Sequence, residues 1–299
     1  MKKTLAGILI IAALILTFVS CGKKSNELKV GIMPDFDSIP FAVAKIEGYL
    51  PENIHLELFM SPMDRDAAFF AGELDGTISD TLAACLMREG GYEAYITSKT
   101  DGCYGVLTAK EIQSARELED LEVGMSLNTV IEYVTYRIID EAGGAADNSP
   151  KVSIPKIPSR LEMLFAGQID AIAVPEPYVS AAQSRGAHVV ATSVELGINP
   201  GVMLFFKESA EGKADALKEL YEAYDKAVLY IQTHDPRDFM PAVIEELGLP
   251  AEALETELPR YTEAVLPEKS EIEAAGEWLL NKEMIKNVYS YDELIYEVK

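Results

Sequence analysis

The sequence has few of the residues that build metal sites, disulfide frameworks and phosphate-binding loops. Its 299 residues include three cysteines, three histidines and one tryptophan. The histidines, His55, His188 and His234, share no ligand spacing, and the chain has no glycine-rich phosphate loop, no G-x-S-x-G elbow and no C-x-x-C pair. We therefore expect a protein that is not an enzyme, with no catalytic residues, no cofactor and no metal site.

Basic residues are also scarce. The chain has 26 Lys and Arg against 49 Asp and Glu, which gives a formal net charge of −23. A surface this acidic repels nucleic acid and anionic lipid. The composition therefore predicts that neither is a partner.

The N-terminus has the features of an export signal. Lys2 and Lys3 precede an apolar run from Leu5 to Val19, which is shorter than the roughly 20 residues of a membrane span. The following Ser20-Cys21-Gly22 resembles a bacterial lipobox, although Phe18 stands where Leu is usual. We expect a signal peptide at residues 1–20, lipidation of Cys21, a tether at residues 21–26 and an extracytoplasmic protein that is lipid-anchored to the cell membrane. An uncleaved anchor and ordinary secretion are the alternatives.

Two further cysteines remain if Cys21 is lipidated. In an exported chain Cys85 and Cys103 either form a disulfide or are buried separately as small apolar thiols.

The chain repeats itself. Residues 28–35 (LKVGIMPD) match residues 121–128 (LEVGMSLN) at an offset of 93, and residues 70–78 (FAGELDGTI) match residues 165–173 (FAGQIDAIA) at an offset of 95. Two matches in the same order and at nearly the same spacing predict two similar α/β units. Two such units facing each other form a cleft in which a small molecule can bind.

Apolar strands alternate with helices up to residue 206, and the rest of the chain is almost purely helical. This alternation predicts an α/β fold with parallel sheets covered by helices. We expect a two-strand hinge at 103–108 and 201–206, one lobe at residues 27–105 plus 205–299, and a second lobe at residues 109–200. The helices expected after residue 206 are 209–233, 236–247, 251–264 and 270–285, with a break at Pro259 as an alternative for the third.

Polar turns follow several predicted strands, directly before helices. Ligands of open α/β sheets bind at such turns, because backbone N–H groups and turn side chains converge there. For Asp37, Ser38 and Asp80, helix capping and ligand contact are equally good interpretations. For Glu176, which lies between two prolines, we favour ligand contact over capping.

A family resemblance is carried by three motifs. LFAGQIDAIAVPEPYVSAA (164–182), SLNTVIEYV (126–134) and MPDFDSIPFAVAKIEGYL (33–50) resemble the nitrate/sulfonate/taurine/thiamine-precursor family of ABC-transporter substrate-binding proteins, as does the C-terminal stretch 271–295. The resemblance implies a type-II periplasmic-binding-protein fold, two α/β lobes, a two-strand hinge, a monomer and an ABC permease as partner. The family's cleft positions fall on Asp35, Asp37, Ser38, Ile39, Pro40, Asp80, Thr81, Asn128, Thr129 and Glu176, with Asn199 as a further candidate.

The ligand class is inferred from the charges of these turns. An anion pocket needs Arg, Lys or dense N–H donors, whereas the candidate turns hold carboxylates and no basic residue. The nearest basic residues, Arg65 and Arg160, begin the predicted helices 64–72 and 159–167. We therefore expect a neutral or cationic nitrogen heterocycle, such as a vitamin precursor. Its stacking partners are sought among Phe36, Tyr104, Tyr133 and Tyr178, for which a place in the core is the alternative.

Other functions fit the same fold. A nitrate or sulfonate binder, a ligand sensor, and an enzyme related to the thiamine-pyrimidine synthesis proteins or to small dehydratases are the alternatives. Cytoplasmic chemistry of the enzyme kind conflicts with an export signal.

Overall fold

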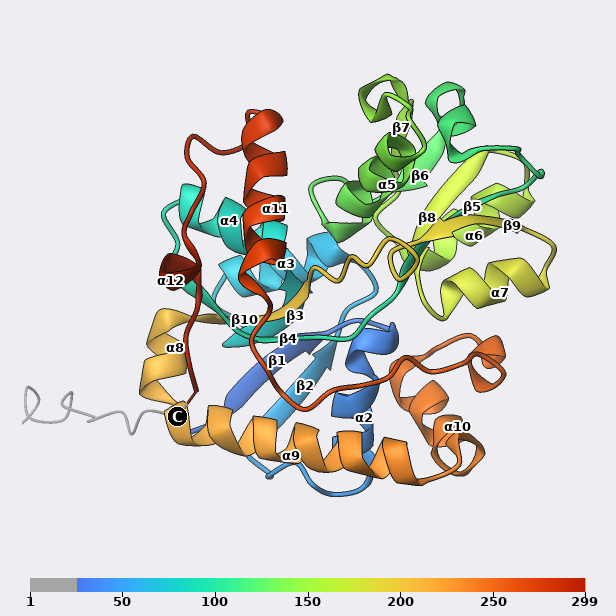
Figure 1. Ribbon diagram of the computed structural model, residues 1–299. Coiled ribbons are helices and arrows are strands. Elements are labelled where there is room, and N and C mark those ends of the chain that lie inside the picture. Colours follow the sequence, from blue (N-terminus) through green and yellow to red (C-terminus); the bar gives the residue numbers. More distant parts are fainter. Residues whose placement is uncertain (1–25, 299) are drawn as a thin grey trace, which may run out of the picture.

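The computed structural model describes residues 26–298, which form two five-stranded sheets in separate halves of the molecule (Figure 1). Sheet A has the order β2-β1-β3-β10-β4, and sheet B has the order β7-β6-β8-β5-β9. We call each sheet with its covering helices a lobe, lobe 1 for sheet A and lobe 2 for sheet B. The strands are β1 (Leu28–Ile32), β2 (Ile54–Leu58), β3 (Gly76–Asp80), β4 (Ala94–Lys99), β5 (Tyr104–Thr108), β6 (Val123–Met125), β7 (Lys151–Ser153), β8 (Ala171–Pro175), β9 (His188–Thr192) and β10 (Gly201–Phe206).

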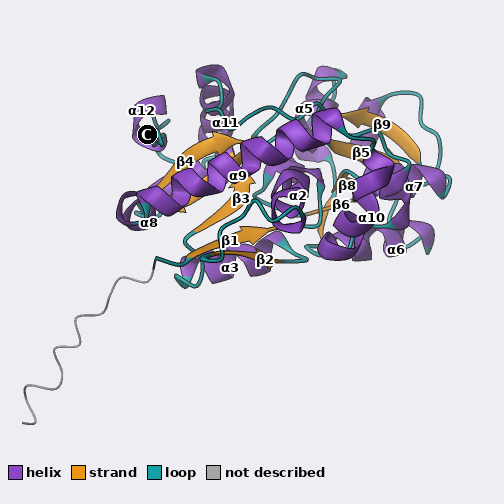
Figure 2. Cartoon of the chain, turned by 90° about the horizontal axis from the view of Figure 1, so that it is seen from below, coloured by secondary structure: helices purple, strands orange, loops and turns teal. Residues whose placement is uncertain are grey.

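Helices cover both sheets. Those of the first 200 residues are η1 (Phe36–Ser38), α2 (Ile39–Ile46), α3 (Pro62–Phe70), α4 (Thr81–Glu89), η2 (Ala115–Asp120), α5 (Val130–Glu141), η3 (Ala146–Asn148), α6 (Ile157–Phe165) and α7 (Tyr178–Ser184). The later ones are α8 (Lys207–Gly212), α9 (Ala214–Thr233), α10 (Pro236–Leu247), η4 (Ala251–Leu254), α11 (Lys269–Asn281) and α12 (Tyr291–Leu294). The long helix α9 lies across lobe 1 (Figure 2) and shares a core with β1 and α2.

The sequence repeat is a structural repeat. The strand orders of the two sheets match position by position, with β1, β2 and β3 of sheet A corresponding to β6, β7 and β8 of sheet B. Gly31 in β1 and Gly124 in β6 occupy equivalent positions. A Cβ on Gly31 would collide with the side chain of Leu74, and a Cβ on Gly124 would collide with that of Ile169, the residue that corresponds to Leu74 in the second repeat. The two lobes are therefore built alike down to single packing contacts.

The last strand of each repeat is exchanged between the lobes. β5 follows β4 in the chain but joins sheet B, and β10 follows β9 but joins sheet A. The expectation of parallel sheets is wrong for these two strands, since β10 is antiparallel to β3 and β4, and β5 to β8 and β9. The physical reason is that each exchanged strand enters its sheet from the other lobe, at the end where the parallel strands stop.

The predicted hinge strands 103–108 and 201–206 are strands, but each lies inside one sheet. The chain crosses from sheet A to sheet B through residues 100–103 and returns through residues 193–200.

The predicted helix 251–264 is wrong. Only η4 forms, and the chain runs without regular helix from residue 255 to residue 268. Pro259 removes a backbone donor inside the expected helix. Tertiary contacts hold the segment instead, because Tyr261 is buried and Asp101 Oδ2 accepts from the backbone N–H (2.7 Å) and hydroxyl (2.8 Å) of Thr262.

The predicted signal peptide and Cys21 lie outside the described residues, as does most of the tether. Within residues 26–298, no helix is long and apolar enough to cross a membrane.

Candidate functional site

A small cavity lies between the two lobes. Its volume is about 40 Å³, enough for only a few water molecules, so the lobes are closed on each other. Lobe 1 lines it with Met33, Asp35, Asp37, Pro62, Arg65, Ile78, Ser79 and Asp80, and lobe 2 with Tyr104, Thr129, Val130, Ile131, Ile157, Arg160 and Pro175.

The turn after β1 is held in place by its own side chains and by the C-terminal segment. Ser38 does not cap α2 with its side chain. Its hydroxyl instead donates to Asp35 Oδ1 (3.2 Å) and accepts from the Met33 N–H (3.1 Å). The Tyr261 hydroxyl donates to the Phe36 carbonyl (2.8 Å) from 225 residues further along the chain. Tyr261 is a positioning residue that sequence reasoning missed.

Asp37 lies against the first crossing segment and against the start of β10. The Tyr104 hydroxyl donates to its Oδ2 (2.8 Å). A Cβ at Gly102 would overlap the Asp37 carboxylate, and one at Gly201 would lie 3.0 Å from Oδ1. Oδ1 is buried, and hydrogen bonds from the Thr100 side chain and the Gly102 backbone oppose the rise in the pKa of Asp37 that burial causes.

Burial shifts the acidities of the cleft. Desolvation and the neighbouring Asp37 raise the pKa of Asp35 to about 8. Desolvation also raises the pKa of Asp37 and of Asp80, and together with Asp37 it raises the pKa of Tyr104 well above its usual value. At neutral pH Asp35 is therefore mostly protonated and can donate as well as accept a hydrogen bond.

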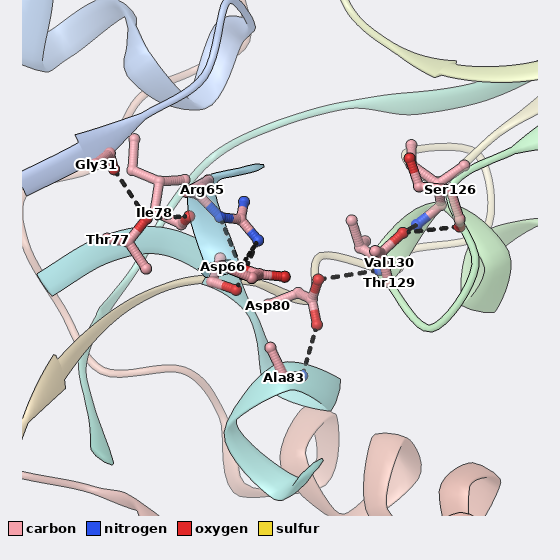
Figure 3. Close-up of polar contacts among 12 residues, drawn as sticks. Gly31, Arg65, Asp66, Thr77, Ile78, Asp80, Ala83, Ser126, Thr129 and Val130 are labelled. Atoms are coloured by element: carbon pink, nitrogen blue, oxygen red, sulfur yellow. Dashed lines mark hydrogen bonds and ion pairs between the residues drawn. The ribbon is translucent and has the colours of Figure 1, made fainter. Parts of the chain in front are cut away.

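Asp80 joins the two lobes (Figure 3). Its Oδ1 accepts from the N–H of Ala83 in α4 (2.8 Å), and its Oδ2 accepts from the N–H of Val130 in α5 (3.0 Å). One carboxylate thus satisfies free N–H groups at two helix N-termini, one in each lobe. A second contact between the lobes runs from the Phe36 N–H to the Glu176 carbonyl (3.1 Å).

Two arginines related by the repeat offset of 95 line the same cavity. Arg65 in α3 pairs with Asp66 (2.7 Å) and donates to Ser79 Oγ (3.2 Å). Burial lowers the pKa of Arg65, but Asp66, Asp80 and Asp35 outweigh burial, so its pKa is raised overall.

Arg160 in α6 is fully buried. It donates to the carbonyls of Ile154 (2.7 Å), Ala173 (2.7 Å) and Pro155 (3.2 Å) and to Ser126 Oγ. Burial alone lowers the pKa of Arg160 to about 9, so the guanidinium stays charged at neutral pH. None of the ion pairs within residues 26–298 includes Arg160. Arg65 and Arg160, which the sequence analysis names as the basic residues nearest the candidate turns, thus both line the cavity.

The remaining predicted residues do not line the cavity. The Glu176 carboxylate caps α7, accepting from the N–H (3.0 Å) and the hydroxyl (2.9 Å) of Ser180, which is the interpretation we ranked second. Asn199 donates to the Thr100 carbonyl (2.6 Å) and so ties the two crossing segments together. Of the predicted cleft residues, Asp35, Asp37, Asp80 and Thr129 line the cavity, and Ser38, Ile39, Pro40, Thr81, Asn128, Glu176 and Asn199 do not.

Of the four proposed stacking partners, only Tyr104 lines the cavity, and Phe36, Tyr133 and Tyr178 pack in the core. Cys85 and Cys103 are free thiols, the first buried and the second half-buried. Within residues 26–298, no group of three or more His, Cys, Asp or Glu side chains is placed to hold a metal ion.

Residues 22–245 match the model of the NMT1-like family, which is more than half of the chain. The chain belongs to the NMT1-like family. A search of curated protein sequences gave no match.

Solved structures similar to this NMT1-like protein include sulfonate- and nitrate-binding proteins. They include the alkanesulfonate-binding protein SsuA from Xanthomonas axonopodis pv. citri with MOPS bound (TM-score 0.78, 14% identity, 91% of this chain and 98% of that chain). The nitrate-binding protein NrtA from Synechocystis PCC 6803 is similar over 90% of this chain and 84% of its own (TM-score 0.74, 14% identity). The Candida albicans CA3427 protein, described as having the generic periplasmic binding protein fold, is similar over 89% and 92% (TM-score 0.64, 14% identity). These likenesses confirm the predicted fold.

Proposed function

We propose that this protein is the substrate-binding component of an ABC importer, which clamps a small ligand between its lobes and delivers it to a membrane permease. The observation that carries the proposal is the cavity itself, to which both lobes contribute charged side chains that are buried. Lobe 1 comprises residues 26–99 plus 201–298, and lobe 2 comprises residues 104–192. The two lobes separate by a change of conformation in the crossing segments 100–103 and 193–200. Closure then buries the ligand, and contacts made only in the closed form shift the equilibrium towards it. No residue is given a catalytic role.

The ligand class follows from the groups that remain available in the cavity. Asp35, Asp37 and Asp80 converge there from lobe 1, and all three side chains are buried. A neutral or cationic nitrogen compound, such as a heterocyclic vitamin precursor, provides the donors these carboxyl groups accept.

Arg160 favours a second ligand class. A buried guanidinium without a carboxylate partner is stabilised by an incoming anion. A sulfonate or nitrate, as bound by SsuA and NrtA, is therefore the second candidate.

A ligand panel distinguishes the two candidates. The chain from Ser25 onward, which contains every described residue, is melted with thiamine precursors, flavins and cationic amines, and separately with nitrate, taurine and alkanesulfonates. A ligand at 100 times its dissociation constant adds about 2.7 kcal/mol, which raises Tm by a few degrees in a protein of this size. Asp37→Asn should abolish a shift caused by the nitrogen compounds, and Arg160→Gln a shift caused by the anions. A chain that no panel member stabilises would overturn both assignments.

We also propose that Cys21 carries the lipid that keeps the protein at the membrane. Full-length protein should sediment with membranes, and Cys21→Ser should release it into the soluble fraction. Equal membrane association of both forms would contradict lipidation.

A further inference from the structure

A second pocket, which we call the hinge pocket, lies between α5, α11 and the crossing segment 193–200 (Figure 1). Its volume is about 190 Å³, which is room for about six water molecules. It is lined by Tyr133 and Arg137 of α5, by residues 196–200, and by Ser270, Glu271 and Ala274 of α11. None of these residues lines the cavity between the lobes, so the hinge pocket is a distinct space.

The hinge pocket is lined by side chains of both charges. Arg137 donates to the Tyr133 hydroxyl (3.0 Å) and to Glu141 Oε1 (3.1 Å), and a guanidinium has further N–H donors for a ligand. Glu271 forms no ion pair within residues 26–298. Its carboxylate accepts the N–H of Glu268 (2.9 Å), and burial raises its pKa. A guanidinium and an unpaired carboxylate in one pocket favour a molecule that carries both charges.

The crossing segment adds an unpaired acceptor. Asn199 donates through Nδ2 to the Thr100 carbonyl (2.6 Å), whereas its Oδ1 is buried and has no hydrogen-bond partner among the described residues. A buried acceptor without a donor is unfavourable, and an ammonium group of a ligand provides donors. Asn199, which the sequence analysis offered as a cleft residue, thus lines the hinge pocket instead.

Both lobes and the segment that joins them build the hinge pocket. α5 belongs to lobe 2, and α11 packs against α4 of lobe 1. Separation of the lobes therefore moves the walls of the pocket apart. A molecule that contacts α5 and α11 together binds the closed arrangement better than the open one, and so favours closure.

We propose that the hinge pocket is a second ligand site, which takes a small zwitterion the size of a short amino acid. The carboxylate of the zwitterion lies against Arg137, and its ammonium group lies against Glu271 and Asn199 Oδ1. Occupancy of this site favours the closed lobes. The inference goes beyond the proposed function, because it concerns a site outside the cavity that holds the transported ligand.

Trp278 provides a signal beside this site. It is the only tryptophan of the sequence, and its ring meets that of Tyr133 (5.5 Å), which lines the pocket. In the ¹⁵N-labelled chain from Ser25 onward, the single indole N–H resonance is followed while glycine, L-alanine, L-serine or β-alanine is added. At least one of the four should shift this resonance saturably. Acetate and methylammonium, which carry one charge each, should bind about tenfold more weakly or less, since each lacks a charge-assisted hydrogen bond.

Two variants locate the binding. Arg137→Gln and Glu271→Gln should each weaken it about tenfold or more. Glu271→Gln keeps an oxygen that can accept the Glu268 N–H, so the first turn of α11 is preserved. The matched control Arg116→Gln, which replaces a 67% exposed arginine paired with Glu119, should bind as wild type does. Thermal melting checks that each variant is folded.

An indole resonance that none of the four zwitterions shifts would overturn the inference. Wild-type affinity in folded Arg137→Gln and Glu271→Gln would also overturn it. A response that is lost in Arg160→Gln but kept in Arg137→Gln would assign the zwitterion to the cavity between the lobes, which overturns it as well.

The link to closure has its own test. Asp80→Asn weakens the hydrogen bond that joins the lobes, so it should raise the apparent dissociation constant of the zwitterion by the factor by which the closed population falls. Asp235→Asn, at the N-cap of α10, is the control and should leave the dissociation constant unchanged. Equal affinities in all three proteins would overturn the link. Neither titration uses a ligand of the cavity, so their failure is distinguishable from failure of the proposed function, which the ligand panel tests.

Discussion

At the scale of single residues, the cleft places acids where water cannot solvate them. Asp35 is 6% exposed and Asp37 is 2% exposed, and both lie in the turn that follows β1. The protonated form of Asp35 is favoured by burial first and by the charge of Asp37 second. The stability that a carboxyl group in this state contributes is lost as the pH rises, whereas the stability contributed by a surface aspartate in an ion pair is lost as the pH falls.

The pH dependence of stability tests this assignment. The pKa of Asp35 is about 8 in the folded protein against 3.8 for an unperturbed aspartate. Between these values the folded state holds a proton that the unfolded state lacks, so the free energy of unfolding falls as the pH rises from about 4 to about 8. One such group contributes a slope of at most about 1.4 kcal/mol per pH unit.

Asp35→Asn, which cannot titrate and keeps the shape of the protonated carboxyl, should lose less stability over this interval than wild type in urea denaturation. Glu52→Gln, on the exposed turn before β2, is the control and should follow wild type. Parallel curves for wild type and Asp35→Asn would contradict the raised pKa.

At the scale of elements, α4 and α5 begin at the same carboxylate. Asp80 is the N-cap of α4 and also accepts from the first residue of α5. The bond to Val130 exists only while the lobes are together, whereas the bond to Ala83 lies within lobe 1. The strength of this contact therefore influences how often the cleft opens.

Asp80→Asn keeps one acceptor oxygen and loses the charge, so one of the two N–H groups loses its partner. Loss of a hydrogen bond to a charged group costs about 1.5–3 kcal/mol. Small-angle X-ray scattering should show a larger radius of gyration for Asp80→Asn than for wild type without ligand. Asp235→Asn, at the exposed N-cap of α10, is the matched control and should leave the scattering unchanged. Identical curves for all three proteins would show that the Val130 contact does not hold the lobes together.

The sequence predicted more of the elements than of the site. The repeat identified the segments that contain β1, β3, β6 and β8, because buried strands leave a local pattern. Strand direction in β5 and β10 leaves no such pattern, since it depends on which lobe the chain has come from. Arg65 and Arg160 were named as the nearest basic residues but not as cleft residues, although the same offset of 95 relates them. The equivalent helices α3 and α6 place the two arginines at equivalent positions. A comparison of the two repeats residue by residue would therefore have predicted both arginines as cleft residues.

At the scale of the whole molecule, α11 connects the lobes outside the crossing segments. It packs against α4 in lobe 1, and its Trp278 meets the rings of Tyr133 (5.5 Å) and Tyr136 (5.4 Å) of α5 edge to face. Lys282, which follows α11, lies over the Tyr136 ring and pairs with Asp147 of lobe 2. Separation of the lobes exposes this aromatic contact.

Trp278 is the only tryptophan in the sequence, so the emission of the protein reports on this contact. A ligand that raises Tm should move the emission to shorter wavelength, because closure holds the indole against the tyrosine rings and away from water. Trp278→Phe should remove the signal and keep the Tm shift. An emission spectrum that does not change while Tm rises would show that α11 moves with lobe 2.

The exchange of β5 and β10 gives the two lobes different folding histories. All five strands of sheet B lie within residues 104–192, so this sheet is complete as soon as that continuous segment exists. In sheet A, β3 and β4 both pair with β10, so their facing edges stay unpaired until residues 201–206 arrive. Unpaired strand edges are templates for association with other chains, and contacts distant in the sequence form slowly. We therefore expect lobe 2 to fold first, and chains that aggregate during refolding to do so through the open edges of β3 and β4.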